Sequence, residues 1–599
     1  MATITAIPKT KIVGGGFLLE ERQTADVFTP EDFSEQQQMI GQTTEEFAVN
    51  EILPQVEKIE HKDFSISRAL LKKAGDLGLS GVEIPEAYGG LEMDKVTAAV
   101  IADHIAKYAG FATTWGAHSG IGLLPLVYFG TEEQKKKYLP RLAAGEIVGA
   151  YALSEATSGS DALNCRARAV LSPDGKHYIL NGEKMWITNA GFADLFTVFA
   201  KIDGEKFSCF LVERNFPGFS IGGEEHKMGI RGSSTCPIIL NDCQVPVENL
   251  LGETGKGATI AFNILNIGRF KLGAMCVGGA RVSLEHAVAY AKQRKAFGKT
   301  IGEFGLVREK IANMATLIYV GESLVYRTVG MMDALLSEID KAGPDAAKEM
   351  RKAIEEYAVE CSILKVWGSE MIDYVVDETM QIYAGYGFVE EYPAERAYRD
   401  ARINRIFEGT NEINRLIITG FLLKRAMSGQ LPLMPAIKKI MDEVLSGPSV
   451  GEEIEGPLAE ERKLVASAKK LGLFVAGAAT QKYMTAIQDQ QEVMGAIADM
   501  AIEIYAMESA VLRSEKIVEQ KGEAAAVLPI AMTQAYLMQS LDKIESAAKK
   551  VVADVADGDM LKTQLAIVRR LAKHEPFNTI ALRQQIAQRT IEVGKYVIA

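Results

Sequence analysis

Residues 169–180 read Ala-Val-Leu-Ser-Pro-Asp-Gly-Lys-His-Tyr-Ile-Leu. Two short runs rich in strand-forming residues flank Ser-Pro-Asp-Gly, which is a turn sequence, so this stretch predicts strand, tight turn, strand. A second pair follows, because Asp203-Gly204 separates the apolar runs 195–202 and 207–212. We therefore predict an all-β segment over about 150–252.

The chain on both sides of this segment has the periodicity of helices. Apolar residues fall on one face at Val277, Ala280, Leu284, Ala287, Val288 and Ala291. Stretches rich in Pro, Gly and acidic residues surround one short helix near 434–445 and indicate a linker. The prediction is a mainly α protein with a central β domain. Its parts are an N-terminal helical domain (1–149), a β domain (150–255), a helical bundle (256–427), a linker (428–457) and an additional helical domain (458–599).

Composition excludes several classes of protein. With 48% hydrophobic and 24% charged residues, the 599-residue chain has globular composition, not that of a disordered or fibrous protein. A net charge of −12 without a Lys/Arg block argues against a nucleic-acid partner. Six Cys without a CxxC pair, and seven His without HExxH, argue against a metal site. The N-terminus lacks a secretory pattern and no uncharged apolar run is long enough to span a membrane, so we expect a cytoplasmic protein.

Familiar catalytic motifs are missing from the sequence. There is no Walker loop, no GxGxxG between a strand and a helix, and no GxSxG. These absences argue against a dinucleotide-binding parallel sheet and against an α/β-hydrolase.

Four other segments carry groups suited to chemistry. They are a Ser/Gly-rich loop (151–161), Lys-Met-Trp-Ile-Thr-Asn (184–189), Gln-Arg-Lys-Ala-Phe-Gly-Lys (293–299), and the pair 381–387 and 405–412. Taken alone, each has an ordinary explanation: a turn, a buried strand tryptophan, a solvated helix end and a surface carboxylate. Glu408 also has a chemical interpretation. The apolar Ile406 and Phe407 beside it can desolvate its carboxyl and raise its pKa towards that of a usable base.

In this order and spacing the four segments resemble the acyl-CoA dehydrogenase family, over roughly residues 40–425. Lys227-Met-Gly-Ile-Arg-Gly-Ser-Ser234 and Phe407-Glu-Gly-Thr410 strengthen the resemblance, and the additional C-terminal helices resemble the very-long-chain branch. The resemblance implies an N-terminal helical domain, a β-barrel-like domain and a four-helix bundle, with FAD between them.

The resemblance also implies roles for individual residues. Glu408 would remove the α-proton of a fatty acyl-CoA while the β-hydrogen leaves as hydride to the flavin, giving a trans-2-enoyl-CoA in fatty acid β-oxidation. Position 268 is Gly, which leaves Glu408 as the only candidate base. The residues implied in FAD binding are Leu153, Ser154, Ser160, Trp186, Ile187, Thr188, Arg294, Phe297, Gln381, Gly385, Thr410 and Glu412. Those implied at the substrate are Ser160, Asn266, Arg269, Gly409 and Gly116.

The same resemblance sets expectations about partners. Gln381 and Gly385 would reach the FAD of a neighbouring subunit in a homodimer, and an electron-transferring flavoprotein would accept the electrons. Gly116 would leave the floor of the acyl tunnel open to long chains. Peripheral membrane association is not favoured, because the net charge is −12 and no basic amphipathic stripe is evident.

Two other functions remain open from the sequence. An acyl-CoA oxidase would share the half-reaction but pass electrons to O2, and the motifs around Glu408 do not exclude it. A non-catalytic acyl-CoA-binding scaffold would have no need of Glu408 together with Trp186-Ile187-Thr188.

Overall fold

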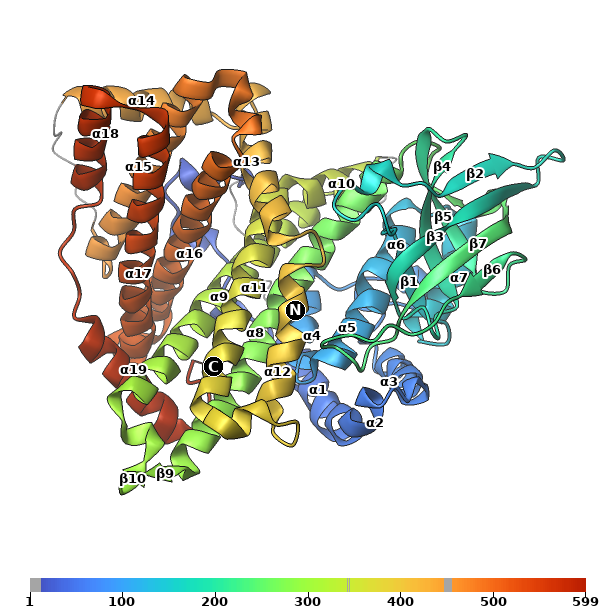
Figure 1. Ribbon diagram of the computed structural model, residues 1–599, viewed down its shortest axis with the longest axis horizontal. Coiled ribbons are helices and arrows are strands. Elements are labelled where there is room, and N and C mark those ends of the chain that lie inside the picture. Colours follow the sequence, from blue (N-terminus) through green and yellow to red (C-terminus); the bar gives the residue numbers. More distant parts are fainter. Residues whose placement is uncertain (1–11, 342, 344, 447–454, 599) are drawn as a thin grey trace.

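The computed structural model describes residues 12–341, 343, 345–446 and 455–598. Residues 1–11, which bear on the predicted absence of a secretory signal, lie outside the described residues, as do 447–454 of the predicted linker. In the part described, helices come first, then a sheet, then a helical bundle and a further set of helices (Figure 1). This is the predicted fold class.

Three of the N-terminal helices described begin at side-chain caps, supplied by Ser34, Asp94 and Thr131. The Asp94 carboxylate accepts a hydrogen bond from the Thr97 N–H at the start of α4, and the Thr131 hydroxyl accepts one from the Gln134 N–H at the start of α7. The helices described before the sheet are α1 (Glu35–Phe47), α2 (Val56–Glu60), α3 (Phe64–Asp76), α4 (Lys95–Ile105), α5 (Ala109–Gly116), α6 (Leu124–Phe129) and α7 (Glu132–Ala143). The turn η7 (Ala117–Gly122) continues α5.

The β segment forms one sheet, and the strands predicted on both sides of Ser-Pro-Asp-Gly and Asp203-Gly204 are confirmed. Its order is β6-β7-β3-β2-β4-β5-β8, with β1 paired to β4. The strands are β1 (Gly149–Ala152), β2 (Arg168–Leu171), β3 (His177–Thr188), β4 (Leu195–Ile202), β5 (Lys206–Glu213), β6 (Phe219–Ile221), β7 (Thr235–Pro246) and β8 (Leu250–Leu251). The register of β3 against β7 shifts between Lys184 and Ile187. That bulge changes the direction in which the Trp186 side chain points.

The bundle is built around α8 (Gly257–Gln293), whose predicted apolar stripe is buried throughout. By length and composition α8 could cross a membrane, but 78% of its most apolar window is buried inside the protein. It packs against α4, α9 and α11. The remaining elements of the bundle are β9 (Lys295–Ala296), β10 (Lys299–Thr300), α9 (Gly305–Ser337), α10 (Ala346–Glu356), α11 (Ala358–Tyr383), α12 (Pro393–Ala401) and α13 (Asn411–Met427).

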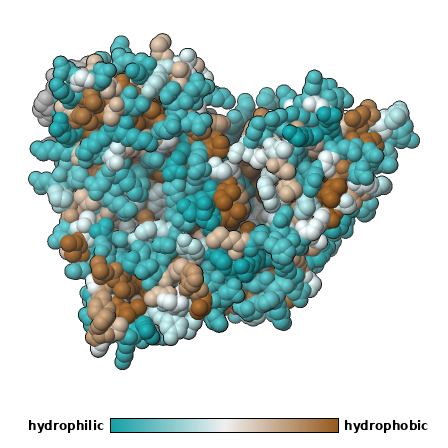
Figure 2. All heavy atoms as spheres, in the orientation of Figure 1, coloured by the Kyte–Doolittle hydropathy of each residue, from teal (hydrophilic) through white to brown (hydrophobic). Residues whose placement is uncertain are grey.

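The further helices stand beside the bundle, on the side away from the sheet (Figure 1). They are α14 (Leu433–Ser446), α15 (Ala459–Tyr483), α16 (Gln491–Lys521), α17 (Glu523–Val555), α18 (Gly558–Leu571) and α19 (Thr579–Val593). Figure 2 shows a mostly polar surface, with a hollow between the β lobe and the helical body and an apolar area at the lower left, over β9 and β10.

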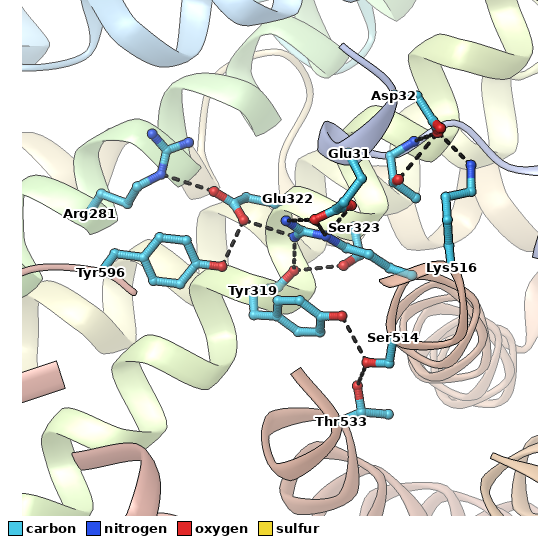
Figure 3. Close-up of polar contacts among 12 residues, drawn as sticks. Glu31, Asp32, Arg281, Tyr319, Glu322, Ser323, Ser514, Lys516, Thr533 and Tyr596 are labelled. Carbon is cyan, nitrogen blue, oxygen red and sulfur yellow. Dashed lines mark hydrogen bonds and ion pairs between the residues drawn. The ribbon is translucent and has the colours of Figure 1, made fainter. Parts of the chain in front are cut away.

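A buried polar cluster joins the further helices to the rest of the chain (Figure 3). Arg513 of α16 binds Glu31 of the N-terminal segment at 3.0 Å and Glu322 of α9 at 2.9 Å. Glu322 also accepts a hydrogen bond from the Tyr596 hydroxyl at 2.7 Å and pairs with Arg281 of α8 at 3.2 Å. Four segments that lie far apart in sequence therefore share one set of buried charges.

Candidate functional site

Glu408 lies in the turn between a short 3-10 helix (Arg402–Arg405) and α13. Its backbone has φ +59°, and Gly409 follows at +82°. Among the described residues, no hydrogen-bond donor reaches the buried Oε2 of Glu408. Burial raises the pKa of this carboxyl to about 7, against the opposing effect of the Arg269 and Lys365 charges. The site therefore holds a carboxylate that can take and release a proton near neutral pH.

Arg269 on α8 binds the backbone of this turn. Its Nε donates to the Glu408 carbonyl at 3.2 Å, and its Nη1 donates to Asn266 Oδ1 at 2.9 Å. Both side chains are buried, and neither is on the wall of the cavity described below. The structure thus places Asn266 and Arg269 against the Glu408 turn, and their part in a substrate channel stays a prediction.

Residues that sequence reasoning missed complete the support. Asn414 Nδ2 donates to the carbonyls of Gly409 at 2.8 Å and Thr410 at 3.0 Å. Lys365 Nζ donates to Asn411 Oδ1 at 2.6 Å, and burial lowers the pKa of this lysine to about 8. The sequence offered a signal for this support in Asn411 and Asn414 near the start of a predicted helix. Asparagine is a poor helix former, so its presence there indicates side-chain bonds to the backbone at the helix end.

Thr410 is the N-cap of α13, since its hydroxyl accepts a hydrogen bond from the Ile413 N–H at 3.3 Å. Glu412 is exposed in the first turn of that helix. Both therefore lie next to the base, and Thr410 serves the helix end.

Gly268 on α8 makes room for the carboxylate. A Cβ built at this position would lie 2.6 Å from Glu408 Oε2, which is closer than real atoms approach. A side chain at this position would push the carboxylate away, so glycine lets Glu408 lie against α8.

A single cavity begins at Glu408 and Gly268 and follows α8 as far as His286. At 1.5 Å per helical residue, this is a length of roughly 27 Å. Residues of α5, α11 and α12 form the other walls. Gly116 and Thr188 both line it, so the structure brings the predicted base, a predicted flavin residue and the predicted tunnel residue to one cavity. A Cβ at Gly116 would lie 2.8 Å from Met275 Cε, which places the two residues against each other.

Trp186 is 57% exposed and has φ +58°, so it is not an ordinary buried strand residue. Ile187, the next residue, is buried, while Thr188 lines the cavity. The same strand thus carries an exposed planar indole and, two residues on, a hydroxyl on the cavity wall, which are groups that suit a flavin ring.

The loop after β1 is tied to β3. Lys184 Nζ donates to the Leu153 carbonyl at 3.0 Å, and the Met185 N–H donates to the Ser154 carbonyl at 2.9 Å. Ser160 is exposed farther along the loop. Leu153 and Ser154 therefore share a fixed frame with the Trp186 strand.

The other predicted FAD residues line a second cavity. Arg294, Phe297, Gln381 and Gly385 come together there, and Phe297 is 95% exposed. A Cβ at Gly385 would meet no atom within 4 Å, so the backbone is open to a ligand. Along α8, Arg294 is roughly 39 Å from Gly268. One chain therefore places the two groups of FAD residues in separate cavities.

These residues fit a flavin dinucleotide. The exposed indole and the Thr188 hydroxyl suit the ring system, and the Arg294 guanidinium with an open glycine backbone suits a pyrophosphate. Trp186 and Phe297 are exposed aromatic side chains that such a ligand would cover.

Family models match the chain in four stretches. Three are described as the acyl-CoA dehydrogenase N-terminal domain (residues 34–146), middle domain (150–243) and C-terminal domain (255–423). A further model, also described as an acyl-CoA dehydrogenase C-terminal domain, matches 467–570.

Individual proteins match over most of the chain. A probable acyl-CoA dehydrogenase of Bacillus subtilis is 48% identical and covers 98% of both chains. The human mitochondrial very long-chain specific acyl-CoA dehydrogenase is 38% identical over 72% of this chain and 67% of its own length. The crystal structure of an acyl-CoA dehydrogenase from Bacillus anthracis, complexed with FAD, has a TM-score of 0.96 and 51% identity and covers 98% of this chain and 100% of that one.

Proposed function

Since the chain belongs to the acyl-CoA dehydrogenase family and is an FAD-dependent enzyme of that family, we propose that it oxidises long-chain fatty acyl-CoA to trans-2-enoyl-CoA in fatty acid β-oxidation. Glu408 is the base in this proposal. The observation that carries it is a carboxyl with a pKa of about 7 at one end of a long, largely apolar cavity.

Glu408 removes the proton from the carbon next to the thioester carbonyl. Its Oε2 has no hydrogen-bond partner among the described residues, so a lone pair is available to receive that proton. Arg269 and Asn414 bind the backbone of the turn and fix the position of the carboxylate. When bound, FAD supplies the hydride acceptor. The proton converts the Glu408 carboxylate to a neutral acid. The free-energy cost of keeping this side chain buried therefore falls as the proton is transferred.

The proposed long-chain preference rests on the cavity walls. Small residues of α5, η7 and α8 line it (Ala109, Ala112, Gly116, Ala117, Gly120 and Gly279). Each additional buried methylene contributes up to ~0.8 kcal/mol of binding. The similarity to a very long-chain specific relative supports the same preference.

We further propose a homodimer in which each chain contributes the second cavity to its partner's FAD. The exposed apolar side chains Phe297 (95%), Leu306 (77%) and Phe388 (82%) support this, because a partner subunit would cover them. Light scattering at micromolar concentration tests the homodimer by measuring the molar mass.

We also propose that an electron-transferring flavoprotein accepts the electrons and that the protein is cytoplasmic. The six buried, unpaired cysteines are consistent with a cytoplasmic location.

The proposed function is tested by anaerobic titration of the purified holoenzyme with acyl-CoAs of increasing length. We expect bleaching of the flavin with palmitoyl-CoA at lower concentrations than with octanoyl-CoA or butyryl-CoA. Bleaching only by short chains would refute the long-chain assignment, and no bleaching by any of them would refute the reaction. Rapid reoxidation of the bleached enzyme by air instead of by the flavoprotein would identify an oxidase.

A further inference from the structure

Two cations, Lys107 and Arg396, and the imidazole of His286 lie at the end of the long cavity remote from Glu408. Leu53, Lys107, His286, Pro393 and Arg396 line it there, at the N-terminal end of α12 and just before α5. Leu53 is 40% exposed, so this end reaches the protein surface. An acyl chain that enters beside Glu408 and fills the cavity would therefore end beside Lys107, His286 and Arg396 and not against an apolar floor.

His286 lies close to both Arg396 and Lys107. Its pKa is lowered by burial and also by the positive charges of Arg396 and Lys107. In the part of the chain that the structure describes, the imidazole has no hydrogen-bond partner. The Tyr383 hydroxyl donates to the backbone carbonyl of His286, not to the ring. A ligand with acceptor oxygens could use a donor that the protein leaves without a partner.

Acidic residues near this end already have partners. Glu60 accepts a hydrogen bond from the hydroxyl of Tyr108, which lines the cavity beside Arg396. Lys107 binds Glu45 at 2.9 Å, and Glu45 also bonds His104. Arg396 meets Glu57 at 3.5 Å, but the Glu57 side chain is 82% exposed, and such a pair contributes little. Asp400, on the same wall, accepts a hydrogen bond from the Ile230 N–H. Arg396 thus retains the capacity to bind an incoming anion.

We propose that Lys107, His286 and Arg396 form a basic rim that binds the carboxylate at the far end of a long ω-carboxyacyl-CoA, the mono-thioester of a long dicarboxylic acid. This substrate class rests on the proposed function, and the oxidation beside Glu408 is unchanged. The planar guanidinium of Arg396 matches a carboxylate with paired donors.

The length of the acyl chain decides whether its terminal carboxylate reaches the basic rim. The cavity is roughly 27 Å long by the rise of α8, whereas one leaflet of a membrane's hydrocarbon core, which holds an ordinary acyl tail, is about 15 Å. A short ω-carboxyacyl chain would therefore leave its carboxylate unpaired between apolar walls, which is costly. A long one would bring it to the rim.

The test compares each ω-carboxyacyl-CoA with the plain acyl-CoA of equal length. For decanedioyl-, hexadecanedioyl- and eicosanedioyl-CoA, the ratio of kcat/KM to that of the plain partner should rise with length in the wild-type holoenzyme. Arg396→Gln should lower the ratio at the longest chain about tenfold, as expected for loss of one charge-assisted hydrogen bond. Lys107→Gln should lower it in the same direction. Lys58→Gln, which removes an exposed charge close to Glu57 but outside the cavity, is the matched control.

Binding gives a second readout that does not depend on turnover. Calorimetric titration of Glu408→Gln holoenzyme should show tighter binding of eicosanedioyl-CoA than of its plain partner, and adding Arg396→Gln should remove the difference. A ratio that stays flat or falls with length, or that Arg396→Gln and Lys107→Gln leave as Lys58→Gln does, overturns the basic rim while oxidation of palmitoyl-CoA keeps the proposed function. Failure to oxidise palmitoyl-CoA would overturn both.

Discussion

Glu408 combines burial with two nearby cations, and the balance between them sets when it can act as a base. Burial raises its pKa to about 7, while Arg269 and Lys365 pull it down. Only the ionised carboxylate can accept a proton, so the rate of flavin reduction should rise with pH through about 7 and level off above it.

Lys365→Met tests this balance. Removing the cation takes away a charge that stabilises the carboxylate, so the pKa of Glu408 should rise and the midpoint of the pH profile should move to higher pH. Stopped-flow reduction by palmitoyl-CoA across a pH series measures it, with the exposed Lys58→Met as control. A midpoint that stays fixed or moves to lower pH would argue that Lys365 does not influence the base.

Gly116 tests the chain-length assignment at one position. In Gly116→Leu, the new side chain would occupy the space between Gly116 and Met275. We expect kcat/KM for palmitoyl-CoA to fall at least about tenfold more than for octanoyl-CoA, because each lost methylene contact contributes up to ~0.8 kcal/mol. Equal losses on both substrates would mean that Gly116 serves helix packing only.

Among the elements, α8 and the turn before α13 act as one unit. Gly268 and Arg269 are adjacent on α8, and one makes space for the Glu408 carboxylate while the other binds its backbone carbonyl. The position of the base therefore depends on the packing of α8 as much as on the turn itself.

Gly268→Ala should move the carboxylate away from its place. Its methyl would lie 2.6 Å from Oε2, so we expect flavin reduction to slow by about 10²-fold, the effect of misplacing a catalytic group by about 1 Å. Gly420→Ala is the control on α13, where a Cβ meets no atom within 4 Å, and it should stabilise the helix by about 0.5–1 kcal/mol without slowing the reaction. Unchanged reduction in Gly268→Ala would refute the close contact.

Sequence patterns predicted the elements better than the connections between them. The strands around Ser-Pro-Asp-Gly and the buried stripe of α8 follow from local periodicity, and both are present. Apolar periodicity in α13 favours a buried face at Ile413, Leu416, Ile417 and Phe421, which are half-buried, whereas Asn414, Ile418, Thr419 and Leu422 are buried. Leu416 and Phe421 pack against the core, but Asn414 also turns inward to bond the carbonyls of the Glu408 turn, which hydrophobic periodicity does not register.

Contacts between distant segments were beyond the sequence. The basic end of the cavity brings Lys107, His286 and Arg396 together from three separate segments, and no spacing along the chain links them. The separation of the FAD residues into two cavities likewise follows from the length of α8 and not from any motif.

For the whole molecule, the Arg513 cluster holds the C-terminal helices to the bundle and the N-terminal segment (Figure 3). Arg513→Gln would leave Glu31 and Glu322 buried without this counter-charge. We expect a loss of about 3–5 kcal/mol in unfolding free energy, as for a broken buried pair. Thermal unfolding measures it, with Arg589→Gln as control, because its pair with Glu592 is more than half exposed. Equal melting temperatures for the two variants would show that the cluster does not stabilise the assembly of these parts.

The claim on which the account depends is that Glu408 is the base of a long-chain acyl-CoA dehydrogenase. The most direct measurement is anaerobic stopped-flow reduction of the flavin by palmitoyl-CoA in wild type and in Glu408→Gln. The amide keeps the shape of the side chain and should retain FAD, but it cannot accept the proton, so we expect reduction to slow by at least about 10²–10⁴-fold. Reduction of the Glu408→Gln flavin at near the wild-type rate would contradict the account.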